Sequence, residues 1–195
     1  MLKIIHRVNK IKELKKIPKE FGVEVDIRTQ NNKLILNHEP FECGDLLDDY
    51  LANFNHSFII LEIKEEGIEK KVIEVCKKHN VEKYFLLSIS FPFMYLLSKQ
   101  GRRKMAVRFS EFESIDTALT LKDKVEWLWV DTFTKLPLDK ESYTRLKKTN
   151  FKICLVSPDR WGRPNEIKKY VNFLKDNEIE IDGVMIGLEY ADEWG

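Results

Sequence analysis

Short apolar runs recur along the chain, and their spacing predicts eight strands that alternate with helices. Strand side chains point to alternate faces with period two, whereas the apolar face of a helix repeats every three or four residues. The runs place strands at residues 2–7, 22–28, 58–64, 83–90, 104–109, 125–130, 151–156 and 181–186. Helical patterns fall between them at residues 10–19, 45–54, 65–79, 92–101, 115–122, 139–149 and 165–177.

Polar residues between the second and third strands predict two further features, a turn and a helix cap. Asn31-Asn32 is a turn signal, after which residues 33–38 return as a further extended segment. Asp45 is expected to cap the helix that follows it, because aspartate is favoured at that position.

The alternation of strands and helices predicts the fold class. It is typical of parallel βαβ units, and eight such units close into a (β/α)8 barrel. The predicted fold is therefore α/β, a compact single-domain TIM barrel over residues 1–195, with no Gly-, Ser- or Pro-rich linker. The competing fold is an open doubly wound sheet, which usually carries a Gly-rich first turn. Residues 6–9, His-Arg-Val-Asn, are not such a turn.

The second strand has the most unusual pattern, because Glu24 and Asp26 alternate with apolar residues. In a barrel these carboxylates point towards the axis, and Glu62 joins them from the next barrel strand. Three ionised carboxylates repel one another strongly when they are shielded from water. A divalent cation resolves that conflict, and Mg²⁺ or Ca²⁺ suits oxygen ligands, with Mn²⁺ a further candidate.

Other polar residues lie at or near the ends of the remaining strands. Taken singly, each fits a solvated strand face or a structural histidine, but their coincidence at one end of successive strands favours a site. Trp127 and Trp129, which precede Asp131, are interpreted as packing residues. The loop at residues 157–164 could bind an anion or a sugar ring, or could be an ordinary turn. The candidate residues at the rim of the site are His6, Arg7, His38, Lys64, Arg108, Arg160 and Trp161.

The order and spacing of these groups resemble the glycerophosphodiester phosphodiesterase family, within the superfamily of phosphatidylinositol-specific phospholipase C-like phosphodiesterases. The resemblance spans nearly the whole chain. The motifs that carry it are His6-Arg7, Glu24-x-Asp26, His38-Glu39, Glu62-Ile63-Lys64, Ser90-Phe91 and Ile181-Asp182-Gly183-Val184.

The resemblance implies a TIM-barrel phosphoric diester hydrolase of lipid metabolism that depends on a divalent metal. It implies that Glu24, Asp26 and Glu62 hold the metal. It implies that His6 and His38 act as general acid and base, and that the cationic side chains of Arg7 and Lys64 contact the phosphate. The expected substrate is a small phosphodiester or a phosphosugar.

The chain departs from the family in three places. Val8 stands where the family has Gly, and the Pro-Glu-Asn-Thr element that follows is missing. Glu39 stands where the family has Asp after its histidine, and the short segment 39–57 leaves no room for the usual inserted subdomain. Two rivals therefore remain: a non-catalytic barrel that binds a phosphorylated ligand or a partner, and a metal-dependent aldolase or isomerase that acts on a sugar phosphate.

The amino-acid composition limits further which class of protein the chain belongs to. The chain is 43% hydrophobic and 33% charged with a net charge of +1, which predicts a sizeable core and no nucleic-acid binding. Three cysteines with no CxxC pair argue for a reducing compartment. With no signal peptide and no membrane-spanning run, a cytoplasmic location is expected.

The Lys-rich helices are interpreted as solvated faces, with a membrane-surface patch at residues 10–19 as the alternative. The oligomeric state is not indicated.

Overall fold

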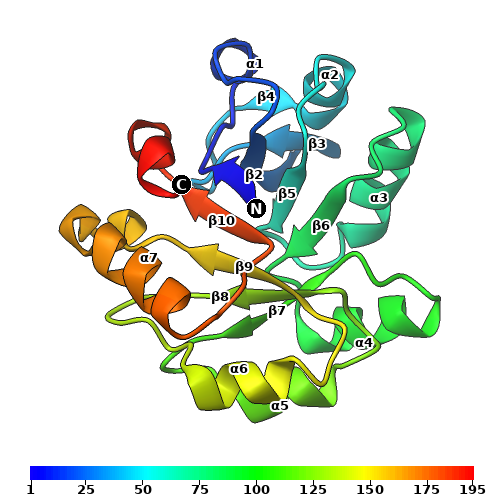
Figure 1. Cartoon of the computed structure of the whole chain (residues 1–195). Helices are drawn as coiled ribbons and strands as arrows, with labels where there is room; N and C mark the ends of the chain where they lie inside the picture. Colours follow the sequence, from blue (N-terminus) through cyan, green and yellow to red (C-terminus); the bar gives the residue numbers. More distant parts are fainter. The chain divides into compact units, whose positions relative to one another are not determined.

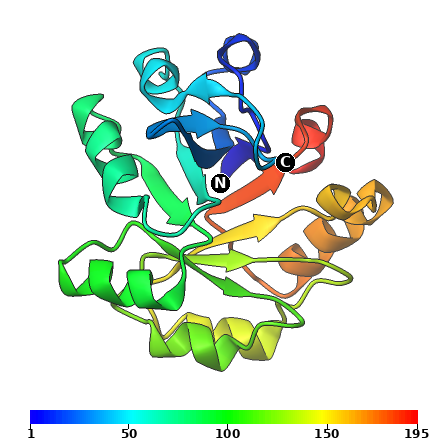
Figure 2. The same ribbon diagram turned by 180° about the vertical axis from the view of Figure 1, so that it is seen from behind.

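The computed structural model describes residues 1–195 and divides them into two compact units. One unit contains residues 4–100, and the other contains residues 1–3 with residues 101–195. Strands alternate with helices along both units (Figures 1 and 2). The expectation of a single domain stays a prediction, and each unit is described by itself.

The unit of residues 4–100 is built around one long strand. β2 pairs in parallel with β1 and with β5, and β5 pairs in parallel with β6. β3 returns antiparallel to β2, and β4 pairs antiparallel with β3. Asn31 and Asn32 join β2 to β3 with φ of 49° and 60°, the left-handed pair that a tight hairpin requires. The strands are β1 (Leu2–Ile5), of which residues 4 and 5 belong to this unit, β2 (Gly22–Gln30), β3 (Lys33–Leu36), β4 (Asp45–Leu46), β5 (Ile59–Ile63) and β6 (Tyr84–Leu87).

Four helices belong to this unit: α1 (Ile11–Leu14), α2 (Leu47–Ala52), α3 (Glu69–Lys78) and α4 (Phe91–Lys99). The ten-residue helix expected at residues 10–19 was wrong, since α1 has only four residues. Several lysines in that stretch repel one another, and no side chain caps its start. No helix in the chain is long and apolar enough to cross a membrane.

The expected role of Asp45 was also wrong. Asp45 lies in β4 rather than at the cap of α2, and Leu46 holds the cap position without a side-chain hydrogen bond. The Asp45 carboxylate instead accepts a hydrogen bond of 2.7 Å from the backbone N–H of Ile11. Asp45 therefore stabilises the first turn of α1, which lies far from it in sequence.

The second unit repeats the same parallel arrangement. β7 (Ala106–Phe109), β8 (Trp127–Val130), β9 (Lys152–Val156) and β10 (Gly183–Ile186) pair in that order, each parallel to the next. The connecting helices are α5 (Ile115–Thr120), α6 (Lys140–Leu146) and α7 (Ile167–Asp176), with short 3-10 segments η1 (Pro158–Trp161), η2 (Pro164–Glu166) and η3 (Leu188–Glu193).

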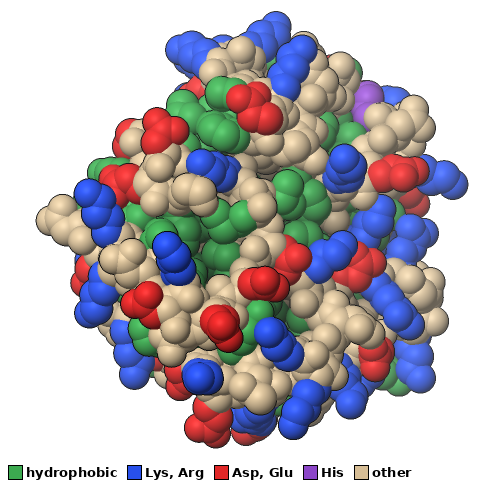
Figure 3. All heavy atoms as spheres, viewed as in Figure 1, with side chains coloured by type: hydrophobic (Ala, Val, Ile, Leu, Met, Phe, Trp, Pro, Cys, Tyr) green, Lys and Arg blue, Asp and Glu red, His purple; other side chains and the backbone are tan.

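The eight parallel strands fall at the eight segments that the apolar runs predict. Every residue of β6, β8 and β10 is buried, as in parallel strands covered on both faces. Trp127 and Trp129 are each 3% exposed and belong to this core. On the face shown in Figure 3, basic and acidic side chains are interspersed, in keeping with 33 basic and 32 acidic residues.

The cap of α6 gives a test of local stability. The Asp139 carboxylate accepts from the Ser142 N–H at 2.8 Å, and the Ser142 hydroxyl accepts from the Asp139 N–H at 2.9 Å. Asp139→Ala should lower the free energy of unfolding by about 1 kcal/mol, measured by urea titration. Asp139→Asn keeps an acceptor and should lose less, and equal losses in the two variants would contradict the cap.

Candidate active site

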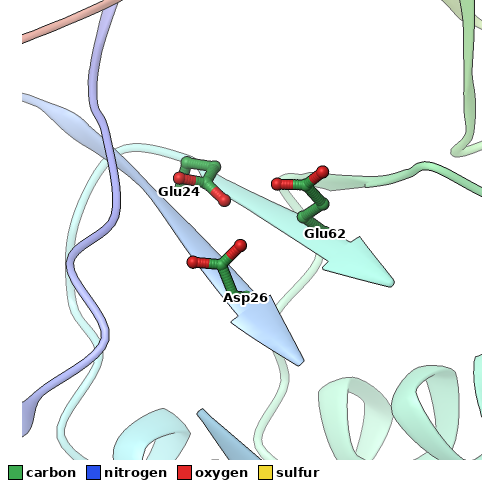
Figure 4. A group of neighbouring side chains, drawn as sticks. All are labelled: Glu24, Asp26 and Glu62. Atoms are coloured by element: carbon green, nitrogen blue, oxygen red, sulfur yellow. The ribbon is translucent and has the colours of Figure 1, made fainter. Parts of the chain in front are cut away.

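Two carboxylates on β2 are removed from water. Glu24 and Asp26 lie two residues apart on one strand face, and each is 1% exposed. Glu62 on β5 stands opposite Asp26 in the parallel register. One oxygen from each of the three side chains lies within 4.8 Å of the others. Figure 4 shows the three carboxylates directed at one another from the two neighbouring strands.

Glu24 is the least compensated of the three. Its Oε2 accepts a hydrogen bond of 2.7 Å from the backbone N–H of Arg7, whereas its buried Oε1 has no hydrogen-bond partner. Burial, and then the charges of Asp26 and Glu62, raise the pKa of Glu24 well above its ordinary value. The ionised form of Glu24 is therefore costly in this protein unless a further cation approaches Oε1.

Asp26 is better compensated. Lys64 Nζ lies 3.0 Å from Asp26 Oδ1 and 3.1 Å from Glu62 Oε1, so one ammonium serves two carboxylates. Asn9 donates a hydrogen bond of 2.8 Å to the other Asp26 oxygen. Burial raises the pKa of Asp26, but Asn9 and Lys64 outweigh it, so that the pKa lies below its ordinary value. Lys64 thus contacts Asp26 and Glu62, while the buried Oε1 of Glu24 is left without a hydrogen-bond partner.

This donor set fits a divalent metal. All three side chains offer carboxylate oxygens, which are the ligands that Mg²⁺ and Ca²⁺ prefer. The unpartnered Oε1 of Glu24 is an acceptor that no group of the protein satisfies. Glu24, Asp26 and Glu62 are the residues that could hold the ion.

Successive residues of the turn after β1 form hydrogen bonds with β2. The Val8 N–H donates to the Glu24 carbonyl at 2.8 Å, and Asn9 exchanges two hydrogen bonds of 2.8 Å with Asp26. Tyr50 donates its hydroxyl to the Val8 carbonyl, also at 2.8 Å. Sequence reasoning missed Asn9 because it stands at a departure from the family pattern. The available signal was its amide side chain, which lies two residues after the strand-end pair His6-Arg7.

The two candidate histidines have different surroundings. His6 Nε2 lies 3.8 Å from Glu24 Oε2, and the His6 side chain is 15% exposed. His38 Nδ1 lies 2.5 Å from Glu39 Oε1, and the His38 backbone carbonyl accepts from the Arg28 guanidinium at 3.0 Å. His6 therefore lies against the carboxylate cluster. His38 is instead paired with Glu39.

The candidate phosphate ligands of this unit border the same cluster. Arg7 Nε lies 3.8 Å from Asp26 Oδ2, and the Arg7 side chain is 44% exposed. Lys64 is 17% exposed and already touches two carboxylates. Ser88, which sequence reasoning did not single out, donates a hydrogen bond of 3.0 Å to Glu62 Oε1. Arg7 is thus the cation of the cluster with the most exposed side chain.

The remaining candidates form a second group, in the unit of residues 101–195. Arg108 and Trp161 converge on the buried Asp131 carboxylate, each with a contact of 3.0 Å. Trp129 Nε1 donates to the same carboxylate at 3.1 Å. Arg160 precedes Trp161 in η1. Asp131 therefore holds the Trp161 indole in place while 44% of that residue stays exposed.

Comparison with solved structures shows the fold. A glycerophosphodiester phosphodiesterase from Agrobacterium tumefaciens is similar over 100% of this chain and 99% of its own, with a TM-score of 0.66 and 13% identity. A phosphodiesterase from Oleispira antarctica, in complex with the product sn-glycerol-3-phosphate, is similar over 95% of this chain and 92% of its own, with a TM-score of 0.65 and 14% identity. These likenesses show a (β/α)8 barrel fold, as the sequence predicts.

The fold by itself does not choose an activity. A mutant tryptophan synthase α-subunit from Pyrococcus furiosus is also similar, over 98% of this chain and 88% of its own, with a TM-score of 0.56 and 12% identity. No family profile and no curated protein matches the sequence. The activity has to be argued from the carboxylate cluster and the groups around it.

The burial of Glu24, with one oxygen unpartnered, predicts an unusual substitution effect. Glu24→Gln should raise the free energy of unfolding in EDTA at neutral pH by about 1 kcal/mol, because a neutral amide avoids the cost of burying or protonating this carboxyl group. The raised pKa of Glu24 means that wild type gains stability relative to the variant as the pH falls. Urea titrations at neutral and mildly acidic pH should therefore show the gap closing in acid.

Exposed Glu42 provides the matched control, and Glu42→Gln should leave stability within about 0.5 kcal/mol of wild type at both pH values. A Glu24→Gln variant that is less stable than wild type at neutral pH would show that the buried carboxylate is satisfied.

Proposed function

We propose that this chain is a metal-dependent phosphodiester hydrolase whose divalent ion is held by Glu24, Asp26 and Glu62. The observation that carries the proposal is the convergence of three carboxylates within 4.8 Å, one of them with a buried, unpartnered oxygen. Structural similarity to several glycerophosphodiester phosphodiesterases supports it. Mg²⁺ and Ca²⁺ are the first candidates, because the donors are all oxygen.

Phosphodiester cleavage needs positive charge and two proton transfers. When bound, the metal supplies a positive charge that stabilises the phosphoryl oxygens. Arg7 adds a guanidinium, which matches phosphate geometry with two parallel hydrogen bonds, and Lys64 adds an ammonium. Both cations already lie within 3.8 Å of the cluster's carboxylates.

His38 is suited to accept a proton. Its Nδ1 faces the Glu39 carboxylate at 2.5 Å, which favours the tautomer that carries the proton on Nδ1. Nε2 then keeps a lone pair that can take the proton of the attacking hydroxyl. That hydroxyl belongs either to water or to a neighbouring position of the substrate. In the second case, water then opens the cyclic phosphate.

His6 is assigned the second transfer. As the new phosphorus–oxygen bond forms, the old one breaks, and His6 gives a proton to the leaving alkoxide oxygen. His6 is 3.8 Å from Glu24 and 15% exposed, so it stands at the cluster and remains accessible to a substrate. The products are a phosphomonoester and an alcohol.

The substrate we propose is a small glycerophosphodiester, with a phosphosugar diester as the alternative. The Oleispira antarctica phosphodiesterase contains sn-glycerol-3-phosphate as its product, which supports this choice. Removal of an alcohol from a glycerophosphodiester would place the reaction in lipid metabolism.

Turnover tests the two histidines. His6→Ala and His38→Ala should each lower kcat by about 100-fold to 10,000-fold on a panel of glycerophosphodiesters, the usual range for a lost general acid or base. Glu24→Gln should remove activity as well. His79 gives the control, because it pairs with Asp48 rather than with the carboxylate cluster, and His79→Ala should keep wild-type kcat.

The outcome also separates the rival functions. If folded wild type cleaves no diester but binds a glycerol phosphate in calorimetry, the chain is a binding protein. If it instead isomerises or cleaves a sugar phosphate, the proposed hydrolysis is wrong.

Metal binding can be tested without turnover. Mg²⁺, Ca²⁺ or Mn²⁺ should raise the Tm of EDTA-treated protein in a concentration-dependent way, by the equivalent of about 2.7 kcal/mol at one hundred times Kd. Glu62→Gln should abolish the rise, because it removes one of the three ligands. Glu42→Gln should retain it, and an unchanged response in Glu62→Gln would show that the ion binds elsewhere.

A further inference from the structure

The outer face of α4 is apolar. Phe91, Tyr95 and Leu96 are 56%, 54% and 51% exposed, whereas Met94 and Leu97 on the opposite face are buried. The spacing of the exposed residues places them on one side of the helix. An exposed cluster of large apolar side chains on one helix marks an interaction surface more often than a single exposed residue does.

The helix that precedes α4 along the chain presents the opposite character. The exposed positions of α3 are occupied by charged side chains, namely Lys70, Lys71, Glu74, Lys77 and Lys78. A charged outer face is what a solvated helix of a globular protein requires. Packing within the fold therefore does not explain why α4 exposes apolar side chains.

The end of α4 is basic. Lys99 lies in its last turn, with Nζ 5.5 Å from the centre of the Tyr95 ring. The chain continues directly into Arg102, Arg103 and Lys104, and no Asp or Glu occurs from residue 91 to residue 110. Arg102 and Arg103 are both exposed. Apolar and aromatic side chains are thus followed by a cluster of positive charge.

We propose that α4 docks on an anionic lipid surface. Helices that lie at a membrane interface carry aromatic and aliphatic side chains on one face and basic residues around it. Phe91, Tyr95 and Leu96 would enter the interfacial layer, and Lys99 with the following arginines would bind the anionic headgroups. With nine residues, α4 is too short to span a bilayer, so the protein would rest on its surface.

A second copy of this chain fits the face less well. Three half-exposed side chains offer far less than the roughly 1,200 Å² that a stable interface buries. A two-fold dimer through α4 would also bring the same basic segment of each copy together, and like charges repel. An anionic surface complements that charge.

The direction of the helix gives the docked orientation. At its N-terminal end, Ser90 donates its hydroxyl to the Glu66 carboxylate, so that end carries negative charge. Lys99 lies in the last turn at the other end, and Arg102 and Arg103 follow it along the sequence. The C-terminal end of α4 would therefore contact the anionic headgroups, while Phe91, Tyr95 and Leu96 along the helix enter the interfacial layer. This proposal does not depend on the hydrolase activity, because lipid binding is measured without turnover.

Vesicle co-sedimentation of the full chain tests the proposal. Wild type should bind phosphatidylcholine vesicles that contain phosphatidylserine, bind pure phosphatidylcholine vesicles much more weakly, and lose binding at high salt. Phe91→Ser with Leu96→Ser should weaken binding about tenfold or more. Arg102→Gln with Arg103→Gln should weaken it by about fivefold per arginine, and this variant leaves the apolar face intact.

The matched control lies on α7, where Phe173 is 37% exposed beside exposed Lys168 and Lys169. Phe173→Ser should bind vesicles as wild type does. Absence of wild-type binding, or equal binding by the α4 variants and wild type, would overturn the proposal. A concentration-dependent dimer that Phe91→Ser with Leu96→Ser abolishes, without any vesicle binding, would assign the face to a second copy.

Discussion

The burial of two carboxylates on the central strand of one unit is the constraint on which the site depends. Glu24 and Asp26 are each 1% exposed, and an ionised carboxylate is expensive to remove from water without partners. The groups nearest to them provide those partners: Lys64, Asn9 and the backbone N–H of Arg7. One oxygen of Glu24, Oε1, has no hydrogen-bond partner. This unsatisfied acceptor is the physical reason to expect a metal ion at the site.

The same constraint explains the form of the turn after β1. The N–H of Arg7 is aimed at the Glu24 side chain, and the following N–H is bound to the Glu24 carbonyl. Hydrogen bonds to the strand on which the carboxylates lie therefore fix the segment that carries His6. A buried charge near a strand end thus also determines where a candidate catalytic side chain lies.

The sequence predicted those strands and side-chain pairs whose pattern lies within a few consecutive residues. All eight parallel strands lie where the apolar runs place them, because burial on both faces leaves a continuous apolar signature. The pair Glu24 and Asp26 could also be found, since period two places both on one face. Features that depend on distant partners were missed. Asp45 binds the first turn of α1 rather than its own helix, and Ser88 reaches Glu62 from the residue that follows β6.

Val8 stands where the family has glycine, and the backbone conformation of this turn shows that the sequence motif does not require glycine at that position. Glycine adopts a positive φ more readily than any other residue, and in this turn that conformation falls on Arg7, with φ of 55°. Val8 does not adopt a positive φ, and its side chain is buried at 4% exposure. A β-branched residue is therefore compatible with this turn, while Asn9 supplies the link to Asp26. The departure alters the sequence motif and still leaves His6 against the carboxylate cluster, so it is no evidence that catalysis is lost.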